Sequence, residues 1–191
     1  DVLDVLQPLA TSPKQDVRAA ALSLFGEERY FNTRILPDVR KLLEENCKDE
    51  LVPAPVRIEA ALSLWRVGTS PQRETAKKAL DQFLRSTDRE LRIRGALALA
   101  ELNVAAGEAW TVLRDVQLEP SDLGRRARLY LQREDERREF ESMLSRLVEQ
   151  KNRPDQIDTK DEYRVLTELR QRVHASHVDG SKVKDDELIE Y

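Results

Sequence analysis

A short motif that recurs four times along the chain constrains its fold more than any other feature. Each copy has a polar or proline entry and an aliphatic anchor, usually followed by arginine, then small residues and a leucine-rich end. The anchors lie 39, 35 and 32 residues apart. This spacing is typical of stacked helical units. The four anchors are Val17, Val56, Leu91 and Leu123.

The first copy shows why the motif predicts a helix with one apolar face. Val17, Ala20, Ala21 and Leu24 are spaced i, i+3, i+4 and i+7, which places them on one side of a helix. We expect this stripe to be buried, with the small residues allowing a neighbouring helix to approach closely. Because one such helix cannot bury its stripe alone, stacked copies would share a continuous core.

Between the motif copies the sequence predicts partner helices. The segment that begins at Ser70-Pro71 has a capping residue followed by proline in the first turn, which favours a helix start there. Glycine and proline separate most of these segments from the motif helices. The partner helices are expected over residues 1–10, 37–47, 70–85 and 107–116.

Composition supports an all-α chain. Hydrophobic residues make up 40% and charged residues 36%, whereas aromatic residues are only 5% and glycines number six. Sandwiches and barrels need aromatic and β-branched strands with frequent glycine turns, so these β architectures are disfavoured. No apolar run reaches the length of a membrane span, and we expect none.

Charge is distributed unevenly. The formal net charge is −4, and the acidic excess lies in residues 133–191, whereas residues 1–132 are neutral. Proteins that bind nucleic acid need a basic excess to release counterions from the phosphates. A nucleic-acid partner is therefore not expected.

The periodicity changes after the fourth motif copy, which suggests three segments. Residues 1–132 would form the repeat domain. Residues 133–151 would be a charged helix that caps the repeats, because a terminal repeat needs a polar outer face. Residues 152–191 read as a linker followed by the truncated start of another domain.

The Asp-Val-Arg-x-x-Ala stretch at residues 16–21, with its later copies, resembles the HEAT-repeat family over residues 1–132. The resemblance implies a right-handed α-α superhelix, a HEAT-like solenoid, of about four helical hairpins with a C-terminal helical extension. HEAT repeats usually build scaffolds that bind proteins or pack on a neighbouring domain. Some bacterial members act on phycobilin chromophores, so a phycobilin-lyase-like protein remains an alternative.

A second resemblance concerns residues 161–191. Tyr163–Val173, His177-Val178-Asp179 and Asp186–Tyr191 are similar to the opening of the carboxy-terminal-processing (tail-specific) serine peptidases, with His177 where that family has tyrosine. The resemblance implies that this chain is the amino-terminal part of such a peptidase, whose catalytic Ser/Lys pair lies beyond Tyr191. No catalytic residue is expected within the chain itself.

Other chemistry-bearing residues are few. Cys47, the single cysteine, follows acidic residues, and a structural role is favoured over a nucleophile. His174 and His177 have metal-compatible spacing but lack an evident set of further ligands, so neither a metal nor a cofactor is expected. The arginines of the motif copies are the candidate interaction surface, either as a basic strip or as partners of nearby acids. They are Arg18, Arg57, Arg92, Arg94, Arg125, Arg126 and Arg128.

Together these features predict a non-catalytic docking scaffold, the regulatory or substrate-recruiting arm of a larger protein. Its partner would be a protein, a peptide or a neighbouring domain of the same chain. The cell compartment depends on which interpretation holds. A free scaffold would be cytoplasmic, and a peptidase arm would be periplasmic or exported.

Overall fold

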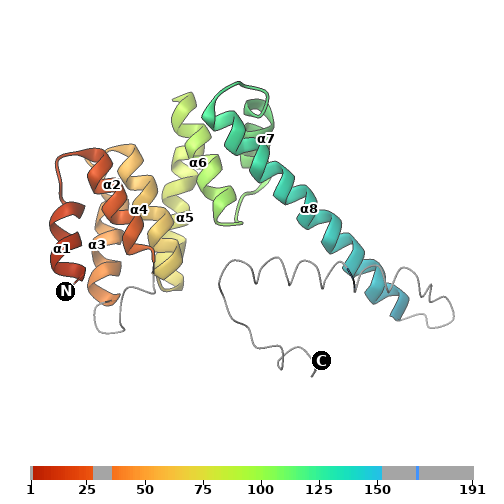
Figure 1. Ribbon diagram of the computed structural model, residues 1–191, viewed down its shortest axis with the longest axis horizontal. Coiled ribbons are helices and arrows are strands. Elements are labelled where there is room, and N and C mark those ends of the chain that lie inside the picture. The colour runs from red at the N-terminus through yellow and green to blue at the C-terminus, as the bar shows by residue number, and fades with distance from the viewer. Residues whose placement is uncertain (1, 28–35, 152–166, 168–191) are drawn as a thin grey trace. The chain divides into compact units, whose positions relative to one another are not determined.

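The computed structural model describes residues 2–27, 36–151 and 167. Within these ranges the chain forms eight α-helices and no β-strand, which confirms the all-α prediction (Figure 1). None of these helices is long and apolar enough to cross a membrane. The helices are α1 (Val2–Ala10), α2 (Gln15–Phe25), α3 (Leu36–Lys48), α4 (Ala54–Val67), α5 (Ser70–Leu84), α6 (Arg89–Glu101), α7 (Gly107–Val116) and α8 (Asp122–Lys151).

Helices α1 to α7 pack in chain order. The three that carry the first motif copies lie side by side, because α4 packs against α2 on one side and against α6 on the other. We call α2, α4 and α6 the motif layer. Helices α3 and α5 pack against each other and against α4, behind this layer. The order of packing follows the alternation of motif and partner helices along the sequence.

Helix α4 lies at the centre of the core. It contacts α2, α3, α5 and α6, so it is enclosed on most of its circumference. Its sequence is correspondingly apolar nearly all round, as expected of a buried helix. Its buried residues are Val56, Ile58, Ala60, Ala61, Leu62, Ser63, Leu64 and Val67.

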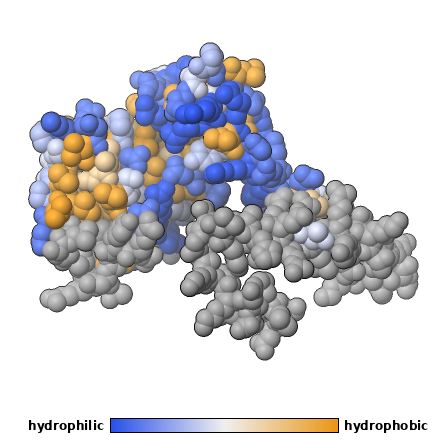
Figure 2. Space-filling model, in the orientation of Figure 1, coloured by the Kyte–Doolittle hydropathy of each residue, from blue (hydrophilic) through white to orange (hydrophobic). Residues whose placement is uncertain are grey.

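The stripe predicted for α2 is wrong at two of its four positions. Ala20 and Leu24 are exposed, whereas Ala21, Leu22 and Phe25 are buried. The contacts of α2 with α1 and α4 select this different face of the helix, and no described helix covers Leu24. On α1, the apolar side chains of Val5 and Leu9 are also exposed. Figure 2 shows apolar residues on the surface at the N-terminal end of the chain.

Helix ends follow local capping chemistry. The Asp88 carboxylate accepts hydrogen bonds from the backbone N–H groups of Glu90 and Leu91, at 2.8 and 3.2 Å, and so caps α6. Helix α5 begins at Ser70, and the residue that caps it is Thr69 rather than the predicted Ser70. The Thr69 backbone N–H donates to the Gln72 side chain at 3.1 Å, as in a capping box.

Helix α8 joins two segments that the sequence analysis separated, since it runs unbroken for 30 residues through the fourth motif copy and the charged segment. The chain divides into two compact units, residues 1–132 and 133–191. In the second unit, Glu134 accepts hydrogen bonds from Arg137 and Arg138. Residues 161–191, for which the sequence resembles the opening of tail-specific peptidases, lie outside the described residues except for residue 167, and so do His174 and His177.

Candidate functional site

The arginines of the first two motif copies lie against the end of α3. The Arg18 guanidinium donates to the Asn46 side-chain oxygen at 2.6 and 3.1 Å. Arg57 donates to the Cys47 carbonyl at 3.3 Å and lies over the Phe83 ring, 5.0 Å from its centroid. Cations are favoured at a helix C-terminus, so both arginines stabilise the junction between neighbouring repeats.

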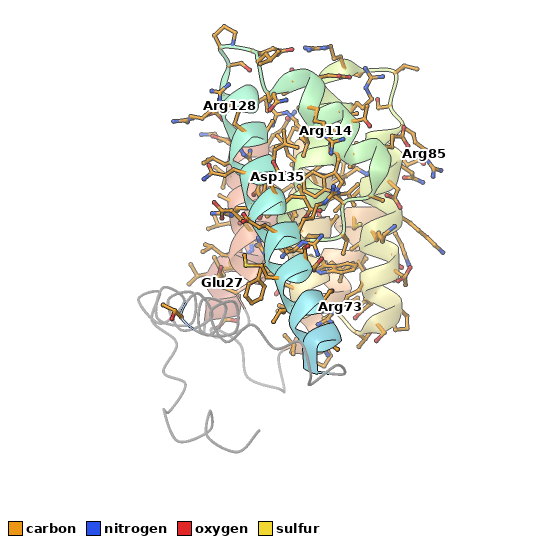
Figure 3. The ribbon with its side chains drawn as sticks, turned by 90° about the vertical axis from the view of Figure 1, so that its right-hand side faces the viewer. Glu27, Arg73, Arg85, Arg114, Arg128 and Asp135 are labelled. Atoms are coloured by element: carbon orange, nitrogen blue, oxygen red, sulfur yellow. The ribbon has the colours of Figure 1, made fainter. Side chains whose placement is uncertain are left out.

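The other candidate arginines lie elsewhere. Arg92 is exposed, and Arg94 pairs with Glu90 at 2.7 Å. Arg125 pairs with Asp122 at 2.5 Å, and Arg128 donates to the Gln117 carbonyl. Figure 3 shows Arg128 on the first turns of α8, Arg73 on α5, and Arg85 directly after the end of α5. Among the candidate arginines, Arg94 and Arg126 line one pocket in the motif layer.

This pocket has a volume of about 120 Å³ and is formed by α2, α4, α6 and the first turns of α8. Its polar lining consists of Glu59, Arg94, Glu101 and Arg126. The remaining lining residues are apolar, and we call them the floor of the pocket. The floor residues are Ala19, Pro55, Ile58, Leu62, Leu97 and Ala98.

The repeat register explains why these polar side chains meet. Glu59, Arg94 and Arg126 each lie three positions after the anchor of their motif copy. In the first copy that position is Ala20. Because equivalent positions on stacked helices face the same way, the repeats bring one carboxylate and two guanidinium groups to the same pocket.

Glu101 is the centre of an ion-pair network at the edge of the pocket. Its carboxylate lies 2.5 Å from Arg66 and 3.8 Å from Arg126, and it accepts a hydrogen bond from the Tyr130 hydroxyl at 3.3 Å. Arg66 and Glu101 are 35 residues apart, which is the local repeat period, so the pair joins equivalent positions of adjacent repeats. Burial, followed by the Glu101 charge, raises the pKa of Tyr130.

Glu59 lies in the same pocket but has no ion-pair partner among the described residues. Burial is the main cause that raises the pKa of its carboxyl, and the negative charge of Glu101 adds to it. The charges of Arg66 and Arg126 and a hydrogen bond from Ser23 act in the opposite direction and are outweighed. Glu59 is therefore a half-buried carboxylate that the protein itself leaves incompletely neutralised.

Two substitutions at neighbouring carboxylates should change stability in opposite directions. Glu59→Gln is expected to raise the free energy of unfolding at pH 7, because it removes a poorly solvated charge. Glu101→Gln should lower it by roughly 0.5–1 kcal/mol, because Arg66 and Arg126 lose their partner. Urea denaturation of both variants, beside the unmodified chain, measures the two effects.

The pH dependence of the Glu59 effect has a definite sign. A raised pKa in the folded state means that folding favours the protonated carboxyl, so this contribution is fully present below the ordinary value of 4.5. It is lost as the pH rises through the folded-state pKa. The advantage of Glu59→Gln should consequently grow from acid to neutral pH, and an advantage that is constant across this range would contradict the assignment.

Cys47 lies in the core at the end of α3 and is fully buried. Burial raises the pKa of its thiol to about 11, so the reactive thiolate is scarce at neutral pH. We expect Cys47 in the folded chain to react with a thiol reagent at least about 100-fold more slowly than in urea. Equal labelling rates in the two conditions would show that the thiol is accessible.

In the part of the chain that the structure describes, no group of three or more His, Cys, Asp or Glu side chains could hold a metal ion. A scan against protein-family models and searches of curated proteins and solved structures find no match to the chain.

The sequence analysis missed Glu59, Arg66, Glu101 and Tyr130. A signal for Glu59 was present, because an acid stands at the repeat position that holds arginine in the next two copies. Arg66 and Glu101 also share one repeat position, ten residues after their anchors. Both repeat positions therefore carry opposite charges in different copies, which is visible when the copies are aligned on their anchors. The sequence prediction considered only the arginines and so did not include these carboxylates.

Proposed function

We propose that residues 1–132 form a HEAT-like solenoid that acts as a docking scaffold, with the motif layer as its binding surface. The single observation that carries this proposal is the pocket in that layer. It is lined by both charged and apolar residues, and three of the charged ones occupy equivalent positions of successive repeats. Such a combination allows both specific polar contacts and burial of apolar surface.

The size of the pocket favours a protein segment as the ligand. Sites for small molecules and cofactors enclose about 300–1,000 Å³. The motif-layer pocket encloses about 120 Å³, which is room for one long side chain rather than for a chromophore. The scaffold function is therefore better supported than the phycobilin-lyase alternative. In a parent peptidase, the docked segment would belong to a substrate or to a neighbouring domain.

A displayed peptide library tests the proposal. Peptides would be selected on the whole 191-residue chain and measured against two charge-reversal variants. Arg126→Glu alters the pocket, whereas Arg73→Glu makes the same change at an exposed position on α5, outside the motif layer (Figure 3). The proposal expects Arg126→Glu to weaken binding at least about tenfold, equal to 1.4 kcal/mol, and Arg73→Glu to leave it unchanged.

Thermal melts of both variants show whether Arg126→Glu remains folded. If the selected peptides bind Arg126→Glu as tightly as the unmodified chain, they bind outside the motif layer. The same conclusion follows if both variants weaken binding equally. Either outcome, or a selection that yields no peptide, would contradict the proposed function.

A further inference from the structure

We infer that the pocket in the motif layer receives the side chain of an arginine or lysine from the docked segment, with its cation paired to Glu59. This inference rests on the proposed docking function and specifies the chemistry of its ligand. The charge balance of the pocket, its apolar floor and its size support this inference.

The charge balance identifies the group that lacks a partner. Glu101 is neutralised by Arg66 and Arg126, and Arg94 is paired with Glu90. Glu59 alone among the charged lining residues has no ion pair with another described residue. A cation entering the pocket would complete that pair in a site partly shielded from water, where charges interact more strongly than on an open surface.

The other charged groups near Glu59 do not replace such a cation. Arg66 of α4 and Arg126 of α8 act on Glu59 through their fields, and both are paired with Glu101 of α6. On the α2 side, Ser23 supplies a hydrogen bond without a charge. None of these groups forms an ion pair with Glu59. The positive charge that neutralises its carboxylate would therefore come from the incoming side chain.

The floor of the pocket suits the stem of a long basic side chain. Arginine and lysine bury their methylene groups along apolar surface while the charged head stays at a polar rim. Ile58, Leu62 and Leu97 provide apolar surface in the pocket that Glu59 also lines. The volume of about 120 Å³ admits one such side chain.

Other side chains fit the pocket less well. An acidic side chain would be repelled by Glu59, and the arginines that could attract it are already paired. An apolar side chain would cover Glu59 without neutralising it, which increases the desolvation cost of its charge. The groups present therefore select a cation over either alternative.

The test uses the whole chain and short capped peptides. Acetyl-Ala-Arg-Ala-amide and its lysine analogue would be titrated by NMR, with the citrulline peptide as a neutral probe of nearly the same shape. Glu59→Gln is the test variant. Glu74→Gln, at an exposed position of α5, is the matched control. Because Glu59→Gln should stabilise the fold, weakened binding by this variant would not reflect unfolding.

The inference expects saturable binding of the arginine and lysine peptides, with shifted amide signals in α4 and α6. The citrulline peptide and the Glu59→Gln variant should each show at least fivefold weaker binding, and Glu74→Gln should match the unmodified chain. No binding of the cationic peptides, equal binding of the citrulline peptide, or unchanged binding by Glu59→Gln would each overturn the inference.

A second comparison separates this inference from the docking function. In this comparison, the basic residues of library peptides that depend on Arg126 are replaced by citrulline or norleucine. If the peptides keep their affinity, the inference that a basic side chain enters the pocket is refuted, but the docking function is not. In that case the motif layer would still be a docking surface. Failure of the library peptides at the motif layer would instead refute the docking function itself.

Discussion

Replacing Leu64 by alanine is expected to lower the free energy of unfolding by about 2–5 kcal/mol. The side chain of Leu64 is 0% exposed and lies on α4, the helix enclosed by four neighbours. Truncation removes apolar contacts and leaves a cavity that packed helices on several sides cannot fill by moving. Urea denaturation monitored by far-ultraviolet circular dichroism measures the loss.

Leu24→Ala is the control, because it makes the same truncation near the end of the first motif copy, seven residues after Val17, whereas Leu64 lies eight residues after Val56. Its side chain is 44% exposed, so the same truncation should cost less than about 1 kcal/mol. The sequence pattern alone predicts similar effects at the two positions. Similar losses for both variants would show that Leu24 is buried in solution, contrary to the structure.

Gly95→Ala is expected to destabilise the chain by about 1–3 kcal/mol, although alanine is the better helix former. Gly95 lies in α6, close to the backbone at the end of α5. A Cβ at this position would lie 2.7 Å from the Leu84 backbone nitrogen and 3.0 Å from the Phe83 carbonyl carbon. These are backbone atoms, which cannot rotate away, so α5 and α6 would have to separate. Thermal and urea unfolding measure the effect.

Gly107→Ala provides the control for helix propensity. Gly107 begins α7, and a Cβ there would meet no atom within 4 Å. This substitution should leave stability unchanged or raise it by up to about 1 kcal/mol. If Gly95→Ala were also neutral or stabilising, the close approach of α5 to α6 would be refuted.

The existence and order of the helices were predictable from the sequence because local signals specify them. Residues 37–47 were predicted as a helix and lie within α3, and residues 107–116 match α7. The apolar period, the capping residues and the glycine and proline breaks all act over a few residues. The capping residue of α5 was misplaced by one position, because Thr69 and Ser70 are both good N-cap residues.

The candidate site was predictable only in part. Arg94 and Arg126 were selected as candidate interaction residues, and both line the pocket. Arg18 and Arg57 were selected by the same pattern, but they contact the end of α3 instead. The contacts of an arginine depend on which helix end lies within reach of its long side chain, and a motif does not specify that distance.

Local sequence signals are sufficient to predict that the described chain folds into helices and that the motif helices alternate with partner helices. Which face of each helix is buried depends instead on the packing of helices that are distant in the sequence. Ala20 and Leu24 lie on an apolar stripe yet are exposed, because the helices that contact α2 cover its other sides. Glu59 is half-buried among charges contributed by three helices. A helix period is a property of neighbouring residues, whereas burial and charge depend on segments that meet only after packing.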